Sequence, residues 1–136
     1  MLVIPLSYDR PPLTMNRPIA NRYARQRVIG EVQIEVGHRI RALPRRQRDA
    51  FPIRVPVSIV LVWSVPDNRV RDTTGPTPTL KAVEDGLVRA GVLVDDRHEM
   101  VPRSGCRIDV TGRYGMHVEI TRIQPRPLIP PSIIAV

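Results

Sequence analysis

The 136-residue chain is poor in several residue types, and each scarcity excludes a class of protein. Its single cysteine, Cys106, cannot form an internal disulfide and fits a reducing compartment. No stretch approaches about 18 uninterrupted apolar residues, so we expect no membrane-spanning helix. The N-terminal sequence MLVIPLSYDRPPL lacks the basic start and the long apolar run of a signal peptide. Together these absences predict a cytoplasmic protein that has no membrane partner.

Aromatic residues make up only 4% of the chain, which disfavours a base-stacking platform for single strands or RNA loops. Basic residues are abundant, with a formal net charge of +8 and a pI near 11.1. Such a charge predicts a polyanionic partner, usually nucleic acid, although an arginine-biased genome would also raise the pI. The arginines are concentrated in 16–27 and 38–51. Arginines with few aromatics recognise phosphate and shape, which suits a duplex or a branched nucleic acid.

The spacing of apolar residues predicts a single α+β domain, since 136 residues suffice for one core and not comfortably for two. A short strand is expected over 2–8. From 19 to 43, apolar residues recur every three or four positions, which predicts a helix that two internal glycines weaken. Residues 53–64 alternate strictly and predict a strand, whose first half Pro56 assigns to an edge of the sheet.

A second main helix is predicted to start with Thr77 as its N-cap and Pro78 as its first residue, and to stop at Gly91. Two further alternating runs, 106–110 and 116–120, are separated by TGRYG and predict a β-hairpin. The tail after them is punctuated by proline and has apolar ends. Either a flexible extension or an arm on a partner subunit would account for it.

All but one of the 21 Lys and Arg residues are arginine, and the single lysine is Lys81. Asp72 follows one strand-like run, and Asp95-Asp96 ends another. Carboxylates at neighbouring strand ends can converge on Mg²⁺, which takes one or two carboxylates plus phosphate and water. A nearby ammonium would neutralise charge that builds up at the phosphorus. Spacing alone does not distinguish this site from a solvated acidic turn beside a capped helix, nor the lysine from chance.

The order of these residues resembles the RusA-type Holliday junction resolvases, a family common on bacteriophage and prophage genomes. Its pattern is a Pro-Pro segment followed by Asn, then PD…RD, a D-x-D-N element, a lysine, an aspartate four residues later and a final Asp-Asp. The resemblance covers roughly residues 2 to 123. The matching residues in this chain are Pro11-Pro12, Asn16-Arg17, PDNRVRD (66–72), Lys81, Asp85 and Asp95-Asp96.

The resemblance implies a nuclease domain over 1–123, with a small mixed β-sheet packed against two main helices, and a Pro-rich extension over 124–136. Asp72 and Asp96 would be catalytic carboxylates that bind Mg²⁺, with Mn²⁺ as the alternative. Lys81 would be the catalytic lysine. Asp95 would be a further metal ligand, and Asp85 a supporting acid.

The chain departs from the family pattern in two places. Thr74 and Gly75 stand where the D-x-D-N element has its second aspartate and its asparagine, and about three extra residues precede the lysine. Thr74 offers only a neutral oxygen and is assigned a supporting role. The acids that could replace the missing carboxylate are Glu99, Glu84 and Asp67.

The resemblance further implies a homodimer that cuts two strands of a four-way DNA junction symmetrically, without an organic cofactor. Two rival functions remain: a catalytically idle protein that binds junctions or other structured DNA, and a small basic RNA-associated protein. The polar and basic residues expected to contact branched DNA are Asn16, Arg17, Arg22, Arg25, Arg27, Arg45, Arg46, Arg69 and Arg71.

Overall fold

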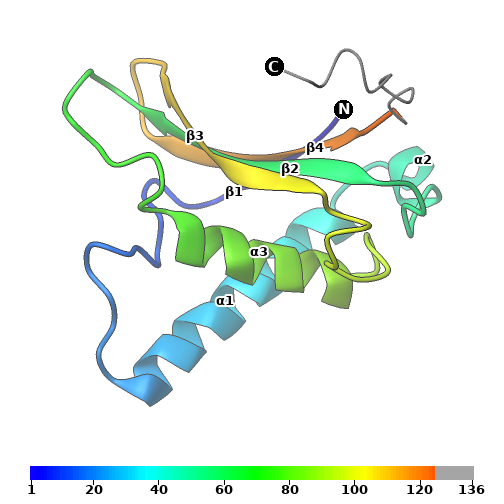
Figure 1. The fold of residues 1–136 in the computed structure, drawn as a ribbon, viewed down its shortest axis with the longest axis horizontal. Helices are drawn as coiled ribbons and strands as arrows, with labels where there is room; N and C mark the ends of the chain where they lie inside the picture. Colours follow the sequence, from blue (N-terminus) through cyan, green and yellow to red (C-terminus); the bar gives the residue numbers. More distant parts are fainter. Residues whose placement is uncertain (125–136) are drawn as a thin grey trace, which may run out of the picture.

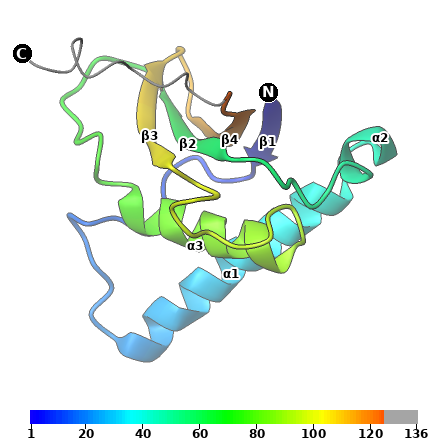
Figure 2. The same ribbon diagram turned by 45° about the vertical axis from the view of Figure 1, so that its right-hand side comes forward.

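A computed structural model of the protein describes residues 1–124. Four strands form one mixed sheet in the order β1-β4-β2-β3, and the helices α1 and α3 pack side by side against one face of it (Figures 1 and 2). This confirms the predicted α+β domain with a small mixed sheet and two main helices. In chain order the elements are β1 (Leu2–Leu6), α1 (Arg22–Arg41), α2 (Arg45–Arg48), β2 (Val57–Val65), α3 (Thr77–Arg89), β3 (Arg103–Val110) and β4 (Gly115–Arg122).

Strand β2 lies at the centre of the sheet, parallel to β3 and antiparallel to β4. Its alternating side chains Val57, Ile59 and Leu61 are completely buried, which explains why this strand occupies the interior. The predicted hairpin between 106–110 and 116–120 is therefore wrong. Both strands form, but β2 separates them.

The connection between β3 and β4 shows why the hairpin prediction failed. The four residues 111–114 must cross two inter-strand spacings, about 10 Å, which so short an extended segment can do. Thr111 donates its backbone N–H to the carbonyl of Val65 at 2.9 Å, so the connection crosses at the end of β2. The TGRYG sequence correctly predicts a reversal of chain direction, but not which strands become neighbours.

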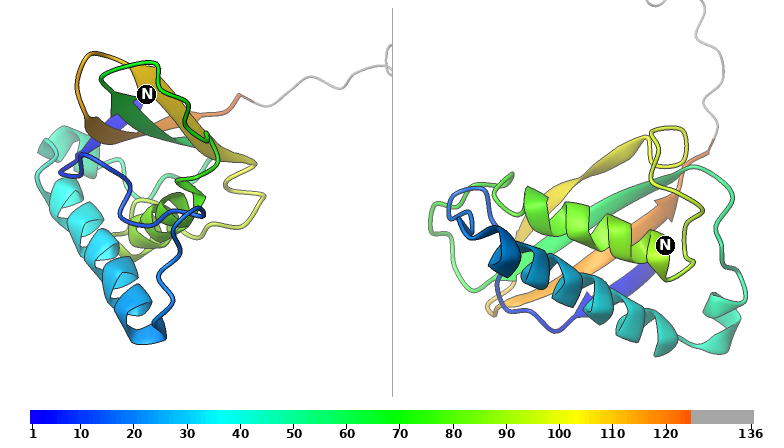
Figure 3. Two further views of the ribbon diagram at one scale, coloured as in Figure 1. Left: turned by 90° about the vertical axis from the view of Figure 1, so that its left-hand side faces the viewer. Right: turned by 90° about the horizontal axis from the view of Figure 1, so that it is seen from below.

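Helix α1 confirms the helix predicted over 19–43, within slightly narrower bounds. Asn21 caps it by accepting a hydrogen bond from the backbone N–H of Ala24 at 3.0 Å. The two internal glycines do not interrupt it. Its buried stripe of Val32, Val36 and Ile40 belongs to the hydrophobic core. The helix runs beside α3 beneath the sheet (Figure 3).

Helix α3 differs from its prediction at the N-terminus. Thr77 is the first helical residue and Pro76 the cap, because the Thr77 hydroxyl donates backward to the carbonyl of Thr74 at 2.6 Å. The predicted stop is correct. The helix ends at Arg89, and Gly91 follows with φ of +79°, a conformation that glycine adopts without strain.

Two predicted extended runs differ from the structure. Strand β2 begins only at Val57, just after Pro56, and the apolar run 92–96 forms no strand. These two regions meet instead through one isolated parallel bridge between Ile53 and Leu93. No helix in residues 1–124 is long and apolar enough to cross a membrane. Of the predicted extension, all residues after Gln124 lie outside the described part of the chain.

Candidate active site

The single lysine lies between two of the predicted acids. Lys81 Nζ is 2.7 Å from Asp96 Oδ2 and 3.3 Å from Asp85 Oδ1. The Lys81 side chain is 63% exposed, so this cluster is open to solvent. Hydrogen bonding between Lys81 and Asp96 raises the pKa of the lysine and lowers the pKa of the aspartate. The charged forms of both groups are therefore favoured.

The fold brings these residues together from two segments. Lys81 and Asp85 lie one turn apart on α3, and Asp96 comes from the loop that returns from α3 to β3 (Figure 2). Val92 and Leu93 anchor the start of this loop in the core, and the Ile53 N–H donates to the Val92 carbonyl at 2.8 Å. These contacts fix the start of the loop that carries Asp96.

Asp95 is directed elsewhere. Its carboxylate accepts hydrogen bonds from the backbone and side chain of Arg97, both at 3.0 Å, and these bonds lower the pKa of Asp95. We find no contact between Asp95 and Lys81 in the described residues. The two neighbouring aspartates therefore differ in role: Asp96 faces the lysine, and Asp95 holds the loop.

Of the three acids considered as replacements for the carboxylate at position 74, Glu84 lies nearest to this cluster. It is only 8% exposed, and its burial raises its pKa, an effect that the charge of Lys81 opposes and the charges of Asp96 and Asp85 reinforce. Asp67 instead forms ion pairs with two arginines. The charge of Glu99 contributes to the raised pKa of Arg97.

Asp72 lines a separate pocket of about 490 Å³ near the start of α3. Its Oδ1 accepts hydrogen bonds from the backbone N–H and the hydroxyl of Thr74, at 3.0 and 2.9 Å. Thr74 therefore holds the Asp72 carboxylate through two hydrogen bonds. The residues around this pocket are Arg10, Pro11, Pro12, Thr14, Asn16, Arg17, Trp63, Val70, Arg71, Asp72, Gly75 and Pro76.

The N-terminal Pro-Pro and Asn-Arg segments reach this pocket through backbone contacts with the α3 region. The Met15 N–H donates to the Gly75 carbonyl at 2.9 Å. The buried hydroxyl of Thr79 accepts from the Leu13 N–H at 3.0 Å and donates to the Leu13 carbonyl at 2.7 Å. A Cβ at position 75 would lie 3.1 Å from the Asp72 carbonyl oxygen, a tight approach, and 3.6 Å from the amide nitrogen of Asn16, an ordinary contact.

Trp63 is a pocket residue that the sequence prediction missed. It was assigned only to the alternating strand, yet it lies near the end of β2 and lines the Asp72 pocket. The guanidinium carbon of Arg71 lies 5.7 Å from the centroid of its ring. Its place at the end of the strand that leads to Asp72 is the signal that could have identified it.

The predicted DNA-binding arginines fall into separate groups. Arg25, on the first turns of α1, lines a small pocket of about 110 Å³ together with Lys81 and Asp85. Arg45 and Arg46 lie on α2, beyond the other end of the roughly 30 Å long helix α1 (Figure 1). The structure therefore places Arg25, but not Arg45 and Arg46, beside the candidate site. Arg22 and Arg27 belong to the α1 group, and Arg69 pairs with Asp67.

The Asp72 pocket and the Lys81 cluster both lie beside the first turn of α3. Pro76 lines the Asp72 pocket, and Pro78 lines the small pocket next to Lys81. In residues 1–124, no hydrogen bond or ion pair joins Asp72 to Lys81 or Asp96. Nor do three or more His, Cys, Asp or Glu residues of this part converge as a ready metal cage.

Two carboxylates nevertheless share one cation, because Asp85 and Asp96 both contact the Lys81 ammonium. Such oxygen donors fit Mg²⁺, which is commonly held by one or two carboxylates and completes its shell with water and phosphate. The carboxylates of Asp72 and Asp96, which the family pattern assigns to the metal, have the same donor chemistry.

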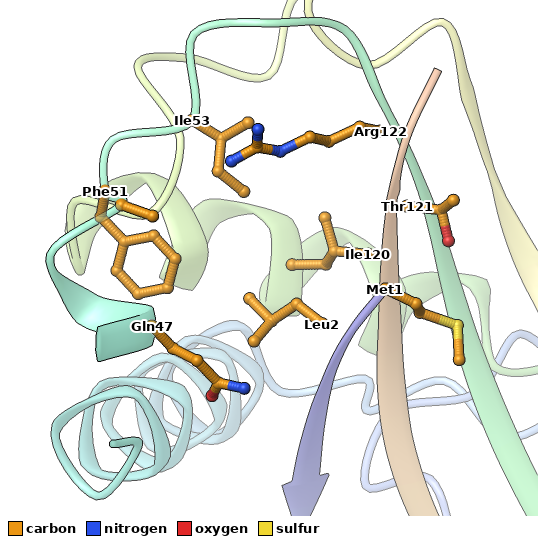
Figure 4. Close-up of a pocket in the computed structure, with 9 residues that line it drawn as sticks. Met1, Leu2, Gln47, Phe51, Ile53, Ile120, Thr121 and Arg122 are labelled. Atoms are coloured by element: carbon orange, nitrogen blue, oxygen red, sulfur yellow. The ribbon is translucent and has the colours of Figure 1, made fainter. Parts of the chain in front are cut away.

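A further pocket, of about 340 Å³, lies between α2 and the ends of β1 and β4 (Figure 4). Phe51, Ile53, Leu2 and Ile120 give it a largely apolar lining, and Arg122 reaches into it. It contains no acidic residue and none of the predicted site residues.

The chain matches no family model, and a search of curated proteins finds no match to it.

Proposed function

We propose that the protein is a RusA-type, metal-dependent endodeoxyribonuclease that resolves four-way DNA junctions in the cytoplasm. The observation that supports this most is the meeting of Lys81 with Asp85 and Asp96, since Asp96 is 15 residues away in the sequence. These are the residues that the family pattern singles out. An ordinary capped helix would not require an acid from the following loop to meet its only lysine.

Lys81 supplies a compact positive charge at the exposed surface, held in place by two carboxylates. A phosphate that entered this cluster would meet an ammonium whose position is already set, and preorganised charge stabilises the negative charge that develops during phosphodiester cleavage. Asp72 and Asp96 would hold Mg²⁺, or Mn²⁺ in its place, and Asp85 would be a supporting acid. When bound, such a cation polarises the scissile phosphate and lowers the pKa of an attacking water.

Paired symmetric nicks require two such sites, which a homodimer would supply. A four-way junction has arms related by a two-fold axis, and an isologous dimer presents two equal basic surfaces to them. Arg25, on the first turns of α1, lies beside the Lys81 cluster and is suited to contact the phosphates nearest the cut. The arginines on α2 would reach DNA farther from it.

One observation favours the alternative of a catalytically idle junction-binding protein. Thr74 replaces an acid and uses both its N–H and its hydroxyl to bind Asp72 Oδ1. A protein that kept its basic surface but lost its metal site would show such a change.

A single assay separates these functions. The purified protein is incubated with a synthetic four-way junction, a linear duplex of the same sequence and a structured RNA, in Mg²⁺, in Mn²⁺ and with a chelator. Paired nicks in the junction that require the metal support the nuclease. Junction binding without cleavage supports the idle protein, and preference for the RNA would refute both.

A further inference from the structure

The Asp72 pocket has an aromatic wall that is held in place from two sides. Trp63 donates its indole N–H to the Asp9 carbonyl at 3.1 Å. Arg71 lies over the same ring, and its side chain is only 12% exposed. Asp67 fixes the Arg71 side chain. The Arg71 guanidinium donates hydrogen bonds to the Asp67 backbone carbonyl at 2.9 Å and to the Asp67 carboxylate at 3.1 Å. The Arg71 guanidinium thus lies against the indole, and both side chains are held in fixed positions.

The remaining lining carries polar and positively charged groups. Arg10 and Arg17 supply guanidinium groups, and Arg10 also lies 5.1 Å from the centroid of the Tyr114 ring. Asn16 adds an amide beside Gly75, and Asp72 lines the same pocket. A volume of about 490 Å³ lies in the range of pockets that hold small molecules.

These groups match the parts of a nucleotide. Bases stack on aromatic rings and on guanidinium planes, arginines bind phosphate, and an asparagine amide can pair with the edge of a base. We infer that this pocket receives one unpaired nucleotide of the DNA substrate, with its base against Trp63 and Arg71 and its phosphate toward Arg17 and Arg10. This inference rests on the proposed function and adds a way of recognising branched DNA.

The pocket would favour branched over linear DNA for an energetic reason. A base in a duplex must lose its pairing and stacking before it can enter a pocket, whereas an unpaired base loses much less. The exchange point of a junction is where such bases are most easily released. Asp72 lines the same pocket, so the nucleotide would also place the backbone close to a residue of the proposed active site.

Trp63 is the only tryptophan in the chain, so its fluorescence reports on this pocket in the unaltered protein. We would measure acrylamide quenching of Trp63 with chelator present, first in the free protein and then with a saturating four-way junction, a short single-stranded oligonucleotide or a linear duplex. The junction and the oligonucleotide are expected to lower the quenching constant at least twofold, because a nucleotide would cover the indole. The duplex is expected to leave it nearly unchanged. Junction binding confirmed by gel shift but without protection of Trp63 would overturn the inference.

A pair of exposed asparagines supplies the matched test. Asn16→Ala, in the pocket, is expected to weaken junction binding roughly fivefold or more and duplex binding little. Asn68→Ala, in the neighbouring loop but outside the lining, is expected to leave both unchanged. Equal effects of the two substitutions would contradict a nucleotide site.

Failure of the pocket and failure of the nuclease give different results. Metal-dependent junction cleavage without Trp63 protection would retain the proposed function and remove the nucleotide site. Protection by the oligonucleotide without any cleavage would retain the nucleotide site and leave a DNA-binding protein.

Discussion

The Lys81 ammonium lies 2.7 Å from the Asp96 carboxylate and so joins the first turns of α3 to the loop that follows the helix. Asp85 is the second carboxylate in contact with the same ammonium. The contact shifts the pKa values of Lys81 and Asp96 in opposite directions, each toward its charged form. The cluster is therefore a fixed arrangement of one positive and two negative charges on an open surface.

Asp96→Asn is expected to abolish junction cleavage while junction binding persists, because the variant keeps the side-chain size and loses a negative charge that opposes DNA binding. Asp72→Asn is expected to have the same effect. Gel-based cleavage and binding assays on one synthetic junction would measure both. Asp95→Asn is the matched control, since Asp95 pairs with Arg97, and we expect it to retain most of its cleavage. Wild-type cleavage by Asp96→Asn would show that the site is assigned wrongly.

Lys81→Arg is expected to reduce cleavage about a hundredfold or more with little loss of junction affinity. Both side chains are positively charged, so the field that attracts DNA should hardly change. The geometry does change, because a planar guanidinium on a longer side chain cannot occupy the position of an ammonium 2.7 and 3.3 Å from two carboxylates. Single-turnover cleavage rates, measured beside binding constants, would separate the two effects. A variant that cleaves at the wild-type rate would make Lys81 an ordinary exposed helix residue.

The helices and strands could largely be predicted from the sequence, because apolar periodicity depends on local geometry. Strand neighbours could not. The alternation within β3 and β4 is equally compatible with a hairpin and with the observed arrangement, in which Leu61 of β2 lies between Cys106 and Val118. The insertion of β2 goes with the complete burial of its core-facing side chains, a property of the assembled sheet.

The candidate site was predicted in part. The sequence pattern identified Lys81 and Asp96, but their contact depends on how the loop after α3 folds back, which the bridge between Ile53 and Leu93 helps to fix. The different orientation of Asp95 and the place of Trp63 beside Asp72 also depend on tertiary structure. Local spacing carries no information about such contacts.

DNA affinity is expected to fall roughly a thousandfold between 50 and 200 mM salt, because several arginine–phosphate contacts would release counterions. Arg25→Gln and Arg45→Gln are each expected to reduce the salt slope by about one, since each would remove a phosphate contact. Fluorescence anisotropy with a labelled junction would measure the slopes. Arg54→Gln removes one charge from an exposed position outside these groups and serves as the control. A substitution that leaves the slope at the wild-type value would exclude that arginine from the interface.

Gly86→Ala is expected to destabilise the fold by about 1–3 kcal/mol, because α1 and α3 approach each other closely at this position. An added Cβ would lie 3.1 Å from Val36 Cβ and 3.2 Å from Gln33 Cα, both on α1. Gly30→Ala, where a Cβ would meet nothing within 4 Å, is the matched control and should stabilise the protein by up to about 1 kcal/mol. Urea denaturation of the two variants would test the contrast. Equal stabilities would mean that the helices are not in close contact at Gly86.

The protein is expected to lose stability below about pH 4, partly through Glu119 on the sheet face opposite the helices. Arg107 binds both carboxylate oxygens of Glu119, at 3.0 and 2.9 Å, and His117 lies 2.9 Å from one of them. These contacts, led by the bond from Arg107, lower the pKa of Glu119 to about 2. An unfolded glutamate has a pKa of about 4.3, so the folded state favours the charged form.

The sign of the effect follows from these two values. The contribution of Glu119 is fully present above about pH 4.3 and is lost as the pH falls through about 2, below which the carboxylate is protonated in both states. Because Arg107 is 46% exposed, solvent screening reduces this contribution to about 1 kcal/mol. Unfolding free energies measured from pH 6 to 2 (the range set by these pKa values) should show that Glu119→Gln is less stable at pH 6 and converges with the wild type at low pH. Glu31→Gln, which removes an exposed carboxylate from α1, should follow the wild-type curve. If Glu119→Gln instead differed from the wild type by the same amount at every pH, the ionised carboxylate would not be the source of the stability.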